Sequence, residues 1–231
     1  MKITVLTLFE NTIWPYLNSS IMLQAQKANL VQFEVVNWRN FCNDKHKTVD
    51  DMAYGGGSGM VLKAEPIINC LNFYKAPNSH VVLLSPEGEQ FSQNCAKKLT
   101  KYEHLILLSG HYEGFDQRIY KYIDQIVSLG DFVLSGGELV ALSVIDATVR
   151  LIKGVINDQS LICESFNDNL LDFPVYTRPY DLKGDKVPEV LLSGDHQKIE
   201  SFRKEQQILK TAKYRPDLYK KYLENKNEKN K

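Results

Sequence analysis

Short apolar runs alternate with polar segments along most of the chain, and five runs have the length and composition of buried strands. These runs span residues 3–9, 31–38, 81–84, 105–108 and 126–129. Helical periodicity lies between or after them, in residues 19–28, 91–101, 115–122 and 138–152. Strands that alternate with helices favour a parallel sheet covered on both faces. The sequence therefore predicts an α/β fold with a mainly parallel sheet.

The pattern changes after the last of these helices. We predict a first domain at residues 1–157, an interdomain loop at 158–188 and a small helical domain at 189–231. The loop segment is rich in Asn, Asp and Pro, and loops of this length in compact proteins are usually functional or disordered. The last segment regains helical periodicity, with Ile199 and Phe202 on one side of a predicted helix.

Charge is distributed unevenly, although the 231 residues carry 28 basic and 28 acidic side chains. Residues 197–231 hold 11 Lys and Arg against 5 Asp and Glu. Such an excess suggests a basic surface that meets an anion such as RNA. Charge alone supports equally well a solvated helical surface rich in lysine.

Several protein classes are disfavoured by the spacing of cysteine, histidine and apolar residues. Cys42, Cys70, Cys95 and Cys163 form no C-x-x-C pair, and the histidines form no H-E-x-x-H spacing, so neither structural zinc nor a disulfide framework is indicated. The apolar opening of the chain lacks a signal-peptide cleavage site, and no run is long enough to cross a membrane. We expect a cytoplasmic protein without a metal site.

Three turns marked by glycine each follow a short apolar run, at residues 84–88, 109–114 and 129–139. Glycine lets the backbone approach a ligand more closely than a Cβ would permit. Three such turns at one sheet edge would form a cradle of main-chain N–H and C=O groups. A cradle of this kind suits a planar purine and its ribose better than a metal, so we predict a site for a nucleotide-like cofactor.

A fourth glycine-rich segment, residues 46–60, combines basic and paired acidic residues with Tyr54, Gly55, Gly56, Gly57 and Gly59. Its many amide donors could close over phosphates or a bound nucleotide. It lacks the Lys and Ser/Thr that follow the last glycine of a P-loop, which disfavours ATP or GTP hydrolysis. A plain mobile linker is the alternative interpretation.

Three charged residues are candidates for chemistry. Glu113 follows a predicted strand and could balance a positive charge in the site, or it could cap a helix that begins near Phe115. Arg150 and Glu164 form the combination that transfer to a ring nitrogen beside a carbonyl requires, since one group removes a proton and the other stabilises charge on oxygen. Alternatively, Arg150 complements a helix dipole and Glu164 lies in solvent.

Six strings bring these features together: TVDDMAYGGGSGM, LSPEG, SGHYEGFDQR, SLGDFVLSGGEL, LLDFPVYTRP and VLLSGDH. In this order they resemble the bacterial tRNA (guanine-N1)-methyltransferase family, and the resemblance runs from Met1 to at least His196. It implies methyl transfer from S-adenosylmethionine to N1 of the guanosine immediately 3′ of the anticodon. It further implies a SPOUT-class sheet with a trefoil knot and a homodimer in which two subunits complete each active site.

The resemblance assigns roles residue by residue. It implies cofactor contacts from Leu84, Gly110, Glu113, Leu129, Gly130, Asp131, Phe132, Val133, Leu134, Gly136 and Gly137. It implies contacts with the tRNA substrate from Tyr54, Gly55, Gly56, Gly57, Gly59, Asp172, Tyr176 and Arg178. The family usually has tyrosine at position 132, and only a backbone contact would survive the change to phenylalanine.

The resemblance also assigns the catalytic pair. Arg150 matches an arginine that steadies the substrate guanine, and Glu164 stands where the family has an aspartate, after a loop one residue shorter. Asp168 and Asp172 are the alternative bases. Two other functions stay open, namely a related methyltransferase acting on ribosomal RNA or on a ribose hydroxyl, and a non-catalytic RNA-binding protein. The sequence does not indicate whether Mg²⁺ takes part.

Overall fold

The computed structural model describes residues 1–162 and 164–229, so Cys163, Asn230 and Lys231 lie outside the described residues. The chain divides into two compact units, Met1–Ile156 and Asn157–Lys231. The second unit therefore includes residues 158–188, for which the sequence predicts an interdomain loop.

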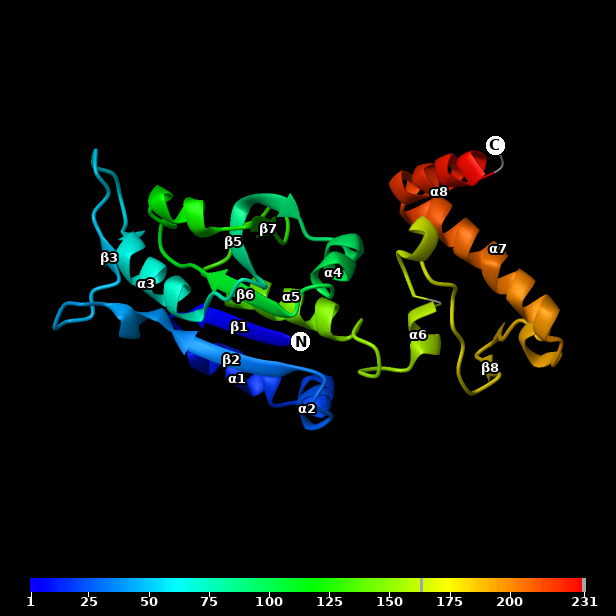
Figure 1. Ribbon diagram of the computed structural model, residues 1–231. Coiled ribbons are helices and arrows are strands. Elements are labelled where there is room, and N and C mark those ends of the chain that lie inside the picture. The colour runs from blue at the N-terminus through cyan, green and yellow to red at the C-terminus, as the bar shows by residue number, and fades with distance from the viewer. Residues whose placement is uncertain (163, 230–231) are drawn as a thin grey trace. The chain divides into compact units, whose positions relative to one another are not determined.

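A five-stranded sheet forms the centre of the first unit, and the predicted α/β architecture is confirmed (Figure 1). Every strand pairing in this sheet is parallel, and the order is β2-β1-β6-β5-β7. The strands are β1 (Lys2–Thr7), β2 (Gln32–Asn37), β5 (Ser79–Gln90), β6 (His104–Ser109) and β7 (Gln125–Ser128). Each of the five predicted apolar runs overlaps one of these strands.

Alternate residues of the strands contribute to two hydrophobic cores, one on each face of the sheet. Val5 and Leu107 belong to one core, and Leu6 and Leu108 to the other. The first face is covered by α1 (Glu10–Leu17), α2 (Ser20–Lys27), α4 (Gln93–Leu99) and α5 (Glu138–Val149). The second face is covered by α3 (Ala64–Tyr74) and the short 3-10 helices η1 (Trp38–Phe41) and η2 (Gln117–Tyr122).

Three observed helices differ from those that the sequence pattern predicts. The sequence does not predict α1 or α3, which contain Pro15 and Pro66. Proline is tolerated in the first turn of a helix, where Pro66 lies, and buried side chains pack both helices onto the sheet. The predicted helix at 115–122 is instead the 3-10 helix η2. Its N-cap is Asp116, whose side chain accepts a hydrogen bond from the Arg118 amide, so the alternative in which Glu113 caps this helix is wrong.

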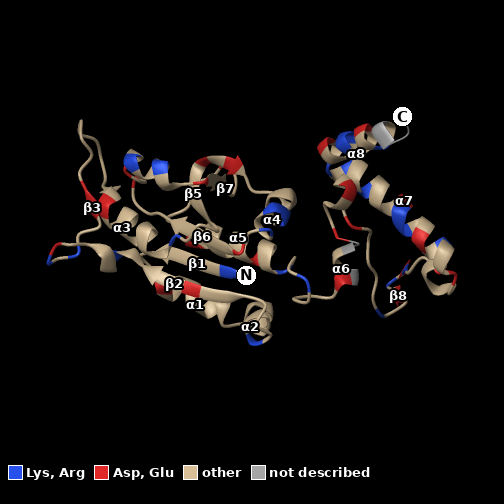
Figure 2. Ribbon diagram, in the orientation of Figure 1, with Lys and Arg blue, Asp and Glu red and all other residues tan. Residues whose placement is uncertain are grey.

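The second unit is built mainly on two helices, α7 (His196–Tyr214) and α8 (Pro216–Lys229). Its shorter elements are α6 (Asp158–Ile162), η3 (Asn167–Asn169), β8 (Asp181–Leu182), β9 (Asp185–Lys186) and η4 (Glu189–Leu192). Thr211, buried in α7, accepts a hydrogen bond from the Leu171 amide at 2.8 Å and thereby ties the segment before Asp172 to this helix. Lys and Arg are spread along α7, which carries five of them against two glutamates (Figure 2).

A buried histidine links three strands of the sheet. His104 is bonded through Nε2 to Thr4 Oγ1 at 2.9 Å and through Nδ1 to Ser79 Oγ at 2.7 Å. Burial, and secondly the positive charge of Lys2, lowers the pKa of His104 below its ordinary value of 6.5. The native state therefore disfavours protonation of this ring more than the unfolded chain does.

The free energy of unfolding should consequently fall as the pH drops below about 6.5, because the unfolded chain then takes up a proton on His104 before the native state does. Urea denaturation at about pH 8 and about pH 5.5 measures this fall, and a His104→Asn chain should lose less stability over the same interval. Between about pH 8 and 9 the two chains should show the same pH dependence, since the ring is neutral in both states. An equal acid loss in both chains would contradict the assignment.

Candidate functional site

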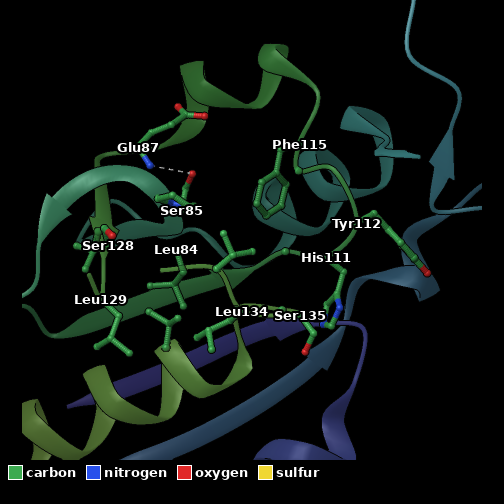
Figure 3. Close-up of a pocket in the computed structure, with 18 of the residues that line it drawn as sticks. Leu84, Ser85, Glu87, His111, Tyr112, Phe115, Ser128, Leu129, Leu134 and Ser135 are labelled. Carbon is green, nitrogen blue, oxygen red and sulfur yellow. Dashed lines mark hydrogen bonds between the residues drawn. The ribbon is translucent and has the colours of Figure 1, made fainter. Parts of the chain in front are cut away.

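A cavity of about 390 Å³ lies at the carboxyl edge of the sheet, where β6 and β7 end and where the pairing of β5 with β7 is interrupted between Leu84 and Glu89. Its walls come from the three glycine-marked turns, which the structure brings together as the sequence predicts. In Figure 3 the side chains of Leu84, Leu129 and Leu134 lie on one side of the pocket and the ring of Phe115 on the other. Cavities of this size at this edge of an open parallel sheet commonly bind small molecules.

Ten of the predicted cofactor residues line this cavity: Leu84, Gly110, Glu113, Leu129, Gly130, Phe132, Val133, Leu134, Gly136 and Gly137. Asp131 is exposed and is not among the lining residues. The structure thus gathers most of these residues in one place, and their contacts with a cofactor stay a prediction.

The glycines at the pocket serve close packing of the protein itself, a reason other than the ligand approach that the sequence suggests. A Cβ on Gly110 would overlap the ring of Phe115, and one on Gly136 would overlap the ring of His111. A Cβ on Gly137 would lie only 3.0 Å from the Cα of Ser109. The glycines therefore allow the turns after β6 and before α5 to interlock.

A buried polar network lies behind this interlocked wall. Glu138, the first residue of α5, has only 5% of its surface exposed. Its Oε1 accepts a hydrogen bond from the Thr7 hydroxyl at 2.5 Å, and its Oε2 lies 2.7 Å from His111 Nε2. The Thr7 hydroxyl oxygen also accepts a hydrogen bond from the Phe9 amide. The network joins the end of β1, the turn after β6 and the start of α5.

The glycine-rich loop between β3 (Asp50–Asp51) and β4 (Val61–Leu62) reaches the same region. Tyr54 at its tip is fully exposed, and Gly55, Gly56, Gly57 and Gly59 have left-handed φ angles between 83° and 128°. The Glu113 amide donates to the Met60 carbonyl at 3.0 Å, and the Glu113 side chain packs against Gly59. The base of this loop is therefore anchored on a turn that lines the cavity.

Arg150 and Glu164 belong to different compact units. Arg150 is the C-cap of α5 in the first unit, and Glu164 lies in the second unit. Both are partly buried. Their meeting at one reaction centre stays a prediction, as does the choice of base.

The other predicted substrate residues lie near Glu164 in sequence. The backbone amide of Asp172 donates a hydrogen bond to Ser165 Oγ at 3.0 Å. The side-chain Oδ1 of Asp172 accepts a hydrogen bond from the Phe173 amide at 2.7 Å. Tyr176 and Arg178 are exposed. Asp168 has a left-handed φ of 50° and lines a second cavity of about 200 Å³ with Lys204 and Tyr222.

Sequence reasoning missed Phe115, Gln117 and Tyr120 of the main pocket wall. Phe115 and Gln117 stand inside one of the glycine-marked strings and Tyr120 closely follows it, and this proximity is the signal that could have found them. The wall residues Ser85, Pro86, Glu87, His111 and Tyr112 belong to turns that the sequence predicts to form the cradle. Tyr120 donates to Glu87 Oε1 at 3.0 Å, and burial, followed by this hydrogen bond, raises the pKa of Tyr120. Glu138 stands directly after two glycines at the start of a largely apolar helical run, and this position is the signal that could have found it.

The described residues, 1–162 and 164–229, include neither a candidate metal site nor a candidate membrane span. No cluster of three or more His, Cys, Asp or Glu side chains there is arranged to hold a metal ion. None of the helices there combines the length and apolar character that crossing a bilayer requires.

The sheet and its cavity define an α/β protein with a small-molecule site at the carboxyl edge of a parallel sheet, joined to a small helical unit. Comparison with known proteins narrows this class. Residues 1–221 match the family described as tRNA (Guanine-1)-methyltransferase TrmD, and the chain belongs to this family.

Curated relatives agree with this membership. A tRNA (guanine-N(1)-)-methyltransferase of Mycoplasma pneumoniae is 77% identical over 231 residues, which are 100% of both chains. A protein of the same name from Malacoplasma penetrans is 53% identical over 96% of this chain and 99% of its own length. One from Clostridium botulinum (strain Eklund 17B) is 49% identical over 99% of this chain and 97% of its own.

Proposed function

We propose that the protein transfers a methyl group from S-adenosylmethionine to N1 of the guanosine immediately 3′ of the anticodon in tRNA. The observation that carries this proposal is that the three motif-bearing turns meet in one cavity of a chain that matches the family from residue 1 to 221. The names of the relatives, which are tRNA (guanine-N(1)-)-methyltransferases, support the same reaction.

The pocket fits the proposed methyl donor. Its apolar side chains, including Phe115, Leu129 and Leu134, suit the faces of an adenine ring, while the main chain of its turns offers donors and acceptors to the adenine edge and the ribose. Glu87 and Glu113 line the same cavity and supply carboxylates for polar or cationic parts of the ligand. S-adenosylmethionine, when bound, supplies a methyl group activated by its sulfonium charge.

Residues of the chain itself deprotonate the guanine and stabilise the charge that develops on it. Glu164 takes the proton from N1, and Arg150 offsets the negative charge that gathers on O6 as the proton leaves. Glutamate keeps the carboxylate of the family's aspartate but extends it by one methylene. Asp168 and Asp172 are the alternative bases under this proposal.

Exposed parts of the chain hold the tRNA. The glycine-rich loop with Tyr54, the exposed Tyr176 and Arg178, and the basic C-terminal helices α7 and α8 are suited to contact the RNA backbone and an extruded base. The guanine has to leave the stack for its N1 to become accessible. Binding through phosphate contacts should weaken as the salt concentration rises.

Two copies of the chain pair to complete each active site under this proposal. Helix α5 is apolar almost all round, which is typical of a helix buried on several sides. Leu139 on this helix is exposed, as are Tyr112, Phe132 and Val133 at the adjacent pocket. A second copy would cover this surface. The family resemblance adds a SPOUT trefoil knot near the cofactor and, because the substrate is tRNA, action in the cytoplasm.

Methylation of two tRNA transcripts tests the function directly. The first carries guanosine 3′ of the anticodon, and the second carries adenosine there and is otherwise identical. We expect N1-methylguanosine only in the first, identified by nuclease digestion and mass spectrometry, in assays run with and without Mg²⁺. A methyl group on a ribose hydroxyl or on ribosomal RNA would indicate a related methyltransferase, and tRNA binding without methylation would indicate an RNA-binding protein.

A further inference from the structure

Behind the wall of the pocket lies a carboxylate that the proposed reaction does not use. Glu138 is buried at the start of α5 and accepts hydrogen bonds from Thr7 and His111. Within the part of the chain that the structure describes, these polar partners are a hydroxyl and an imidazole, and neither Lys nor Arg forms an ion pair with it. Thr7 has no charge to offset that of the carboxylate, and neutral imidazole can hold it by donating Nε2–H.

This carboxylate lies only one layer of atoms away from the cavity. His111 and Gly136 both line the pocket, and a Cβ on Gly136 would stand 2.6 Å from Glu138 Oε2. In Figure 3 His111 lies beside Ser135 at one end of the pocket. The negative charge of Glu138 is therefore held against the backbone of a pocket-lining residue.

Burial decides how far this charge acts. Water screens an exposed carboxylate strongly, whereas a fixed charge in a medium of low dielectric constant interacts over several ångströms with little loss. Glu87 and Glu113 are exposed carboxylates of the same wall, in contact with solvent. Among these three acids, Glu138 is the one whose charge the solvent screens least.

We propose that Glu138, held by Thr7 and His111, makes this pocket distinguish a cationic ligand from a neutral ligand of the same shape. The inference rests on the proposed function, in which the pocket binds S-adenosylmethionine. The donor carries a sulfonium charge, and the product S-adenosylhomocysteine has a neutral thioether at the same atom. Glu138 is thus a specificity-determining residue that favours the charged donor and speeds the exchange of spent product for fresh donor.

Calorimetry with three probes tests this role: S-adenosylmethionine, S-adenosylhomocysteine and sinefungin, whose amine supplies a positive charge near the same position. In the Glu138→Gln chain, which keeps the size of the side chain and one of its two acceptor oxygens, we expect the preference for S-adenosylmethionine over S-adenosylhomocysteine to fall by about tenfold. The preference for sinefungin over S-adenosylhomocysteine should fall by a similar factor. Glu89→Gln, which removes an exposed carboxylate of β5 outside the pocket wall, should leave the ratio within about twofold of the wild-type value.

The ratio of the affinities for S-adenosylmethionine and S-adenosylhomocysteine separates an effect of the Glu138 charge from a change in the structure of the pocket. A variant that merely loosens the pocket weakens all three ligands by a similar factor and leaves the ratio unchanged. Glu138→Asp keeps the charge and should keep the ratio even where the affinities fall. His111→Arg adds a permanent positive charge beside an intact Glu138 and should lower the ratio. This variant tests the same role if the Glu138→Gln chain fails to fold.

The possible outcomes distinguish the two proposals. An unchanged ratio in Glu138→Gln or in His111→Arg, with binding retained, would overturn the role of Glu138 and leave the methyltransferase proposal standing. A wild-type chain that binds neither S-adenosylmethionine nor S-adenosylhomocysteine would overturn both.

Discussion

A chain carrying Glu164→Ala is expected to bind S-adenosylmethionine as tightly as the wild type and to methylate tRNA about a thousandfold more slowly. The physical reason is that a positioned general base contributes on the order of 10²–10⁴-fold to such a rate. The donor pocket is built from residues of the first compact unit, and Glu164 belongs to the second. Single-turnover methyl transfer and calorimetry of donor binding measure the two effects separately.

The alternative bases provide the controls for this prediction. Asp168→Asn and Asp172→Asn each remove one carboxylate from the same segment and should keep most of the activity. Glu164→Asp restores a carboxylate one methylene shorter and should recover part of the lost rate. Full turnover by Glu164→Ala, together with a large loss in Asp168→Asn or Asp172→Asn, would move the base to that residue.

Gly136→Val should reduce the affinity for S-adenosylmethionine by about a hundredfold, the equivalent of about 2.7 kcal/mol. The new side chain would occupy the space of the His111 ring and press on the Glu138 carboxylate. Breaking a buried hydrogen-bonded network of this kind is among the mechanisms that give large destabilisation. The melting temperature should therefore fall as well, by several degrees, and calorimetry with thermal denaturation measures both quantities.

Gly184→Ala is the matched control for the glycine prediction. Gly184 has a left-handed φ of 97°, and a Cβ there would meet nothing within 4 Å. Alanine at this position incurs backbone strain of about 1 kcal/mol without steric overlap. We expect a small stability loss and unchanged donor affinity. Donor binding by Gly136→Val at the wild-type level would contradict the role given to the interlocked turns.

The sheet could be predicted from sequence because its signal is local. Each strand is a short apolar run bounded by turn residues, and each of the five predicted runs overlaps an observed strand. The sequence does not predict helices α1 and α3, because their prolines obscure the helical periodicity. Packing on the sheet nevertheless stabilises both helices. The sequence predicts a helix at residues 115–122, and the structure has a 3-10 helix at Gln117–Tyr122, because a short apolar spacing does not distinguish a 3-10 helix from an α-helix.

By itself, the sequence determined the class of fold, the three glycine-marked turns of the pocket and membership of a methyltransferase family. All of these depend on residue types at fixed spacing along the chain. Only the tertiary structure decided why the glycines are needed and where the buried charge lies. Thr7 and Glu138 are 131 positions apart, and His111 reaches Glu138 only because Gly136 leaves room for its ring. The partners of a buried carboxylate are set by how strands and turns pack together, and periodicity along the chain carries no record of that packing.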